Sequence, residues 1–171
     1  MVWLAAAALL AAGGAQADPG RIALTADLDA PAARVVRILS DVSRYPLIYP
    51  AIKRAEVRER SPGRSISHIE IEFPWPIGSR WLVAETSTAG ERIRWRRLDG
   101  TIRRFEASLV ARDVSAGRSR ATYDALVDPG WAGPGWLSGW LEARILEGLV
   151  SETRRYLRDQ ADEVAASTSA R

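Results

Sequence analysis

The sequence contains no cysteine and a single histidine, His68. The missing cysteines exclude disulfide bonds, thiol nucleophiles, thiolate zinc sites and iron–sulfur clusters, and they leave no cysteine for lipid attachment. One histidine cannot build a multi-histidine metal site. We therefore expect neither a metal nor a cofactor in this protein.

Lysine is nearly absent too, because 23 of the 24 basic residues are arginine and only Lys53 is lysine. With 21 acidic residues, the net charge is +3. The arginines within 92–97, together with Arg103 and Arg104, form a basic stretch that would attract phosphate groups. Interleaved glutamates and the small net charge argue against nucleic acid as a partner. Anionic lipid headgroups are the more natural partner of such a surface.

The first seventeen residues contain no charged side chain, are apolar from 2 to 12, and end in an A-x-A pattern at Ala17. This pattern predicts a cleaved signal peptide over 1–17 and an exported, periplasmic or extracellular protein. The apolar run of about a dozen residues is shorter than the ~20 that a membrane-spanning helix needs. An uncleaved tail remains the alternative, because no basic side chain precedes the apolar run.

Removal of residues 1–17 would leave 154 residues (171 minus 17), enough for one domain with a core and room for an internal cavity. We place this domain at 18–164 and expect the small polar tail 165–171 to be disordered. Since no repeat or linker interrupts the chain, we expect a single domain. We also expect the protein to be a monomer.

Periodicity and turn residues predict a strand, two helical segments, six consecutive strands and a long helix. The first strand covers 21–28, a helix begins at Pro31 and stops near Asp41, and a short apolar helical turn lies between the prolines of 45–50. The six strands are expected at 52–60, 65–73, 80–88, 92–98, 101–112 and 119–127, with Asp99-Gly100 as a short hairpin turn. An amphipathic helix of seven to eight turns runs from Trp136 to about Val164, on the period of 3.6 residues.

Alternation within the strands predicts one apolar, aromatic sheet face that the long helix covers. The side chains assigned to that face are Ile69, Ile71, Phe73, Trp81, Val83, Ile93, Trp95, Phe105, Ala107, Leu109, Ala121, Tyr123, Ala125 and Val127. The opposite face is expected to be solvated and mostly basic, with Arg80, Arg92, Arg94, Arg96, Arg104, Arg118 and Arg120 among His68, Glu70, Glu72 and Glu106.

Three segments resemble the START-like, or SRPBCC, superfamily. "DAPAARVVRILSDVSRYPLIYPAIKRAEV" (29–57) resembles its opening strand and helices, "FPWPIGSRWLV" (73–83) resembles a "PWP…R" run, and "TYDALVDPGWAGPGWL" (122–137) resembles the last strand and the entrance to the C-terminal helix. The resemblance extends over about 21–160. It implies an α+β helix-grip fold, a curved antiparallel sheet wrapped around a long C-terminal helix, with a cavity between them for an apolar molecule.

The candidate ligand-binding residues are those that would line this cavity from the sheet and the long helix. From the sheet they are Ile69, Ile71, Phe73, Trp81, Trp95, Phe105, Leu109 and Tyr123, and from the helix Leu137, Trp140, Leu141 and Ile145. Ordinary core packing is the competing interpretation for each of them. Trp95 and Tyr123 are the better candidates, because each has a polar atom that needs a partner when buried.

The loops near the predicted cavity entrance contain Trp75, Trp131 and Trp136, which we interpret as a gate or as a contact with membrane lipid. Capping of the core by Trp131 and Trp136 is the alternative. We assign no catalytic residue, because His68 falls on the solvated face and no nucleophile, metal or phosphate-loop motif is present.

The resemblance and the residues together predict non-catalytic binding or transport of a lipid, sterol or quinone. The alternative is a polyketide cyclase or aromatase, since such an enzyme can act largely by folding its substrate in a shaped cavity. The sequence therefore leaves the ligand, and the choice between binding and conversion, open.

Overall fold

The computed structural model describes residues 20–73, 75, 77–128, 130, 148 and 150–160. The predicted signal peptide 1–17, the tail 165–171 and most of 129–149 lie outside these residues. Within the described ranges, no helix is long and apolar enough to cross a membrane.

Seven antiparallel strands make one sheet in the order β1-β7-β6-β5-β4-β3-β2. The strands are β1 (Arg21–Leu28), β2 (Ile52–Ser61), β3 (Arg64–Phe73), β4 (Gly78–Ala89), β5 (Arg92–Gly100), β6 (Arg104–Ser115) and β7 (Arg118–Asp128). Between β1 and β2 lie α1 (Ala32–Ser40), the 3-10 turn η1 (Val42–Arg44) and α2 (Tyr45–Ile48). Residues 150–160 belong to the C-terminal helix.

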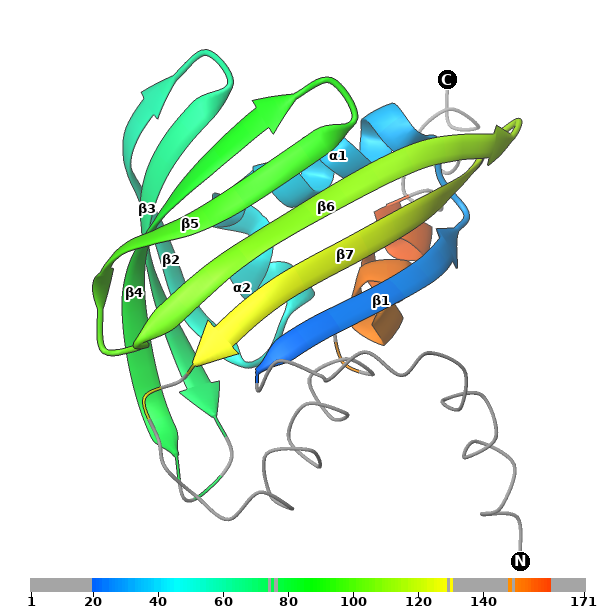
Figure 1. Ribbon diagram of the computed structural model, residues 1–171. Coiled ribbons are helices and arrows are strands. Elements are labelled where there is room, and N and C mark those ends of the chain that lie inside the picture. The colour runs from blue at the N-terminus through cyan, green and yellow to red at the C-terminus, as the bar shows by residue number, and fades with distance from the viewer. Residues whose placement is uncertain are drawn as a thin grey trace, which may run out of the picture.

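The sheet curves around α1, α2 and the C-terminal helix, which all lie against the same face (Figure 1). We call this helix-covered side the concave face and the opposite side the convex face. Most buried hydrophobic residues form one core between the concave face and the helices, and Leu157 of the C-terminal helix belongs to it. Thr153 is also buried. Burial of both residues agrees with the amphipathic helix predicted for this segment.

Helix α1 forms because its apolar side chains recur at helical spacing and its first turn has an external cap. Val35, Val36, Ile38 and Leu39 are buried in the core. The backbone N–H of Ala32 donates to Asp113 Oδ1 at 2.7 Å, which satisfies one of the free N–H groups at the helix start. The first turn of α1 is therefore attached to the far end of β6.

The predicted elements are confirmed in type and order over the described residues, and β1 has the predicted bounds. The Asp99-Gly100 hairpin is wrong, because both residues still pair with β4. Strand β6 begins at Arg104 rather than at 101, so residues 101–103 make the connection. Gly100 has a φ of +128°, and a Cβ there would lie 2.4 Å from the Trp81 carbonyl oxygen. Glycine is needed for this close approach of two strands, and not for a turn.

The predicted face is wrong for part of β4. Trp81 pairs with Glu70 and Val83 pairs with His68, so both side chains lie on the convex face. The concave side chains of β4 are Leu82, Ala84 and Thr86, all of them buried. By the same register Arg80, opposite Ile71, lies on the concave side rather than on the basic face.

Candidate ligand-binding site

The concave face brings together most of the predicted sheet residues. Ile69, Phe73, Trp95 and Leu109 are buried in the core, while Ile71, Phe105 and Tyr123 are half-buried and pack against it. Trp81 does not join them, because its ring stacks on His68 on the convex face, with centroids 5.4 Å apart. Leu137, Trp140, Leu141, Ile145, Trp131 and Trp136 lie outside the described residues. Trp75 follows β3 and is 90% exposed.

Trp95 is held by a hydrogen-bond chain that reaches α1. Its indole Nε1–H donates to the Tyr45 hydroxyl at 2.9 Å, and that hydroxyl donates to the Leu39 carbonyl oxygen at 2.6 Å. Burial raises the pKa of Tyr45 well above its ordinary value. Sequence reasoning missed Tyr45, although the tyrosine beside a proline in "SRYPLIYP" marks the segment that folds over the sheet.

Two further tyrosines lie close to this chain. Tyr49 packs edge-on against Tyr45, and its hydroxyl is 3.0 Å from Thr153 Oγ1 of the C-terminal helix. Burial raises the pKa of Tyr49 to about 12 and also raises that of Tyr123. The Tyr123 ring lies 6.3 Å from that of Trp95, and its hydroxyl has no hydrogen bond within the described structure. At neutral pH these phenols are protonated, so they can donate hydrogen bonds but cannot act as bases.

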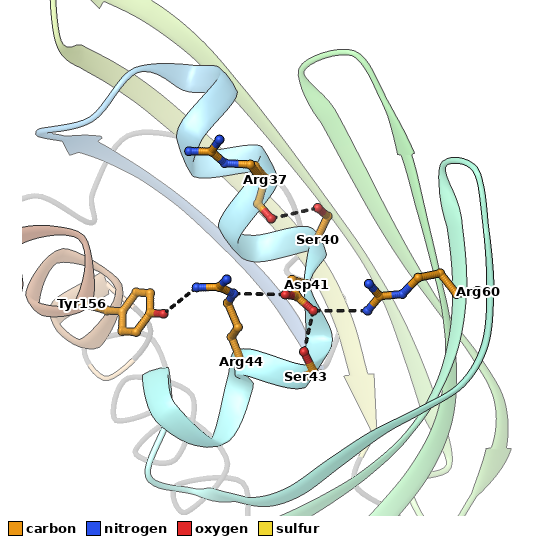
Figure 2. A network of polar contacts seen from close by, with 7 residues as sticks. All are labelled: Arg37, Ser40, Asp41, Ser43, Arg44, Arg60 and Tyr156. Carbon is orange, nitrogen blue, oxygen red and sulfur yellow. Dashed lines mark hydrogen bonds and ion pairs between the residues drawn. The ribbon is translucent and has the colours of Figure 1, made fainter. Parts of the chain in front are cut away.

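Polar contacts fasten the C-terminal helix to the rest of the domain. Figure 2 shows Asp41, at the end of α1, accepting hydrogen bonds from Ser43 and Arg44 and pairing with Arg60 of β2 at 3.4 Å. Arg44 also donates from Nη1 to the Tyr156 hydroxyl at 3.2 Å. Partial burial opposes ionisation of Asp41, but the hydrogen bonds from Ser43 and Arg44 prevail and lower its pKa. The charged network therefore persists at neutral pH.

The same turn of the helix is also attached to β1. The Arg154 guanidinium donates to the Asp27 carbonyl oxygen from two nitrogens, at 3.1 and 3.2 Å. Together with the Tyr49–Thr153 and Arg44–Tyr156 contacts, it gives the helix three polar attachments over one turn. The C-terminal helix thus closes the concave face by side-chain contacts as well as by apolar packing.

The concave face offers little acid–base chemistry within the described strands. The carboxylate that the strand register places there, Asp113, already accepts the hydrogen bond at the start of α1. His68 lies on the convex face, as predicted, against Trp81. The described residues contain no group of three side chains suited to a metal ion. Within the described strands, the concave face thus presents a mostly apolar surface with few polar groups.

A hollow of about 430 Å³ also lies on the convex face, across β1, β7, β6 and β5. Its lining includes Arg21, Arg94, Arg96 and Asp124, and Arg21 pairs with Asp124 at 3.0 Å. Such exposed charged side chains do not suit an apolar ligand. The concave face remains the candidate site.

Comparison with known families agrees with this geometry. Residues 28–154 match the model of the family described as polyketide cyclase / dehydrase and lipid transport. The chain belongs to this family. A search of curated proteins finds no match.

Several solved structures have the same fold as this protein. A START superfamily protein from Mycobacterium smegmatis is 19% identical, with a TM-score of 0.74, and the match covers 82% of this chain and 98% of that one. A STAR-related lipid transfer protein from Xanthomonas axonopodis is 20% identical, with a TM-score of 0.71 and coverage of 84% and 89%. The Zhui aromatase/cyclase from Streptomyces sp. R1128 is 19% identical, with a TM-score of 0.62 and coverage of 80% and 94%.

These matches confirm the predicted superfamily and its α+β helix-grip fold. The family description names both polyketide cyclases and lipid transport, so membership by itself does not separate binding from catalysis. The residues of the concave face must distinguish the two for this chain.

Proposed function

We propose that this protein binds a hydrophobic small molecule, such as a lipid, sterol or quinone, between the concave face and the C-terminal helix, without converting it. The observation that carries this proposal is the chemistry of the concave face. Its strands present apolar and aromatic side chains, and its single carboxylate, Asp113, is used to cap α1. Apolar lining with a few polar groups is what a carrier site requires.

A cyclase that works by general acid–base catalysis needs a group whose pKa lies near the working pH. Burial moves the pKa values of Tyr45, Tyr49 and Tyr123 upward, away from that range. His68 faces the other side of the sheet. The raised pKa values of the tyrosines and the position of His68 favour a carrier over a polyketide cyclase.

The test is native mass spectrometry of the protein purified from its own host, in wild-type form and in two variants of β7. Tyr123→Ala removes a half-buried ring from the concave face, and Thr122→Ala changes the neighbouring convex side chain. We expect a co-purified apolar ligand in the wild type and in Thr122→Ala, and reduced occupancy in Tyr123→Ala. A ligand-free protein that turns over an added poly-β-ketone would show a cyclase instead.

We also propose that the protein is exported and that Trp75 contacts membrane lipid when the ligand enters or leaves. An indole exposed to 90% suits the membrane–water interface. Val114, half exposed near the opposite tip of the sheet, provides a matched control. We expect Trp75→Ala to weaken binding to vesicles that contain anionic lipid and Val114→Ala to leave it unchanged. Equal binding by Trp75→Ala and wild type would remove the membrane contact.

A further inference from the structure

Arg97 of β5 differs from the other arginines around it in the face that it occupies. It pairs in register with Ala84, a core residue with no exposed surface, and it lies two residues after Trp95 on the same strand face. Its side chain is therefore on the concave side. Sequence analysis counted Arg97 in the basic stretch 92–97, although the alternation that puts Trp95 on the concave face puts Arg97 there too.

The Arg97 guanidinium is poorly satisfied by the protein. Its Nη2 donates to the Gly100 carbonyl oxygen at 2.8 Å, whereas its Nε is buried and has no hydrogen-bond partner among the described residues. No carboxylate pairs with it in the part of the chain that the structure describes. By contrast, the neighbouring Arg96 on the convex face forms an ion pair with Glu85, with 3.4 Å between Arg96 Nη2 and Glu85 Oε1.

Two buried hydroxyls near Arg97 also lack partners. Ser67 pairs with Ala84 from the other side, and Thr86 follows Ala84 by two residues on the same strand face. Neither Ser67 Oγ nor Thr86 Oγ1 makes a hydrogen bond within the described parts of residues 20–128 and of the C-terminal helix. Ser67, Thr86 and Arg97 thus surround Ala84 as a polar patch in an apolar face. Buried polar atoms without partners are uncommon, and a half-buried cation without a counter-charge is costly.

We propose that Arg97 binds an anionic headgroup, a carboxylate or a phosphate, at one end of the apolar ligand. A guanidinium presents parallel N–H donors that match both groups, and the bond is strongest where water is excluded. This inference rests on the proposed function and adds the class of ligand: an apolar chain with an acidic end, rather than a neutral sterol or quinone.

The test compares three probes that share one C16 chain and differ only in the headgroup: palmitate, hexadecyl phosphate and hexadecanol. Dissociation constants are measured at pH 8, below the critical micelle concentration of each probe, for wild type, Arg97→Gln and Arg96→Gln. We expect wild type and Arg96→Gln to bind at least one anion about tenfold or more tightly than hexadecanol. Arg97→Gln should lose this preference and bind palmitate and hexadecyl phosphate no more tightly than hexadecanol. The anion that binds more tightly identifies a carboxylate or a phosphate as the headgroup.

Three results would contradict the proposal, and they separate it from the proposed function. If wild type binds hexadecanol as tightly as both anions, the role of Arg97 is wrong and apolar binding stands. If folded Arg97→Gln keeps the preference for an anion, another group supplies it. If no C16 probe binds and no ligand co-purifies, both proposals fail. If Arg97→Gln does not fold, the affinities of the wild-type protein for the three probes still decide whether the ligand has an acidic end.

Discussion

The two faces of the sheet are built from the same strands but satisfy their polar groups in opposite ways. On the convex face, arginines pair with carboxylates across strands, as in Arg21–Asp124 at 3.0 Å and Arg120–Asp27 at 2.7 Å. On the concave face, Trp95 donates to Tyr45 and Tyr45 donates to a backbone carbonyl, and Arg97 has no acidic partner within the described residues. These convex ion pairs need no ligand, whereas Ser67, Thr86 and Arg97 of the concave face have buried polar atoms without partners among the described residues.

The two faces should also contribute unequally to the stability of the fold. Exposed ion pairs contribute little, because water screens them and side-chain entropy opposes them. Buried apolar contacts and buried hydrogen bonds contribute much more for each residue. Substitutions at neighbouring positions of one strand should therefore have unequal effects.

The largest expected effect comes from Leu82, which is 1% exposed on the concave face. We expect Leu82→Ala to lower the free energy of unfolding by about 2–5 kcal/mol, because it leaves a cavity in the core. Val83→Ala, on the convex face, should cost about 1 kcal/mol or less. Urea denaturation of both variants measures the difference. Equal losses would mean that the assigned register of β4 is wrong.

A smaller loss is expected when the hydrogen-bond chain from Trp95 is cut. Tyr45→Phe leaves the Trp95 indole N–H and the Leu39 carbonyl without their buried partner, so we expect a loss of about 1–3 kcal/mol. Tyr123→Phe removes a hydroxyl that has no hydrogen bond within the described structure, and it should change stability by less than about 0.5 kcal/mol. Similar urea midpoints for the two variants would contradict the chain as a stabilising element.

The tyrosines of the concave face predict a loss of stability in alkali. Burial raises the pKa of Tyr49 from 10.0 to about 12, so its contribution is fully present below pH 10 and is lost as the pH rises toward 12. The urea midpoint should fall between pH 10 and 12 in wild type, and it should fall less in Tyr49→Phe. The same slope in both proteins would show that Tyr49 is not the group responsible.

The convex face predicts a weaker dependence at acid pH. The hydrogen bond from Arg120, with nearby arginine charges, lowers the pKa of Asp27 below its ordinary 3.8, and desolvation opposes this only in part. Its contribution is therefore present above pH 4 and is lost as the pH falls below that value. We expect a small drop in the urea midpoint from pH 5 to pH 3, part of which Asp27→Asn removes. If the urea midpoint of Asp27→Asn falls as much as that of wild type, other carboxylates are responsible for the fall.

Sequence reasoning predicted the order of elements well, because most strands have one apolar parity and clear turn residues at their ends. It failed on β4, where both parities contain apolar side chains: Trp81 and Val83 on one side, Leu82 and Ala84 on the other. Only pairing with β3 selects the buried set, and that pairing is not visible in a single strand.

The site was harder to predict than the fold for a similar reason. Trp95 and Tyr123 were found because they lie in regular strands with one apolar parity. Tyr45, Tyr49 and Arg97 were missed because their roles depend on which distant groups they meet, such as Leu39, Thr153 and Ala84. Contacts between segments far apart in the chain come from strand register and helix docking, which local patterns do not encode.

The most direct test of a concave binding face uses the two tryptophans that lie on opposite sides of the sheet. In a ¹⁵N-labelled protein, the indole N–H signals of Trp95 and Trp81 are assigned by Trp→Phe substitution and followed during titration with palmitate and with hexadecanol. If the ligand occupies the concave face, the Trp95 signal shifts because its hydrogen bond to Tyr45 lies in the site, and the Trp81 signal stays in place. A shift of Trp81 with an unchanged Trp95 would place the ligand on the convex face and contradict the proposed function.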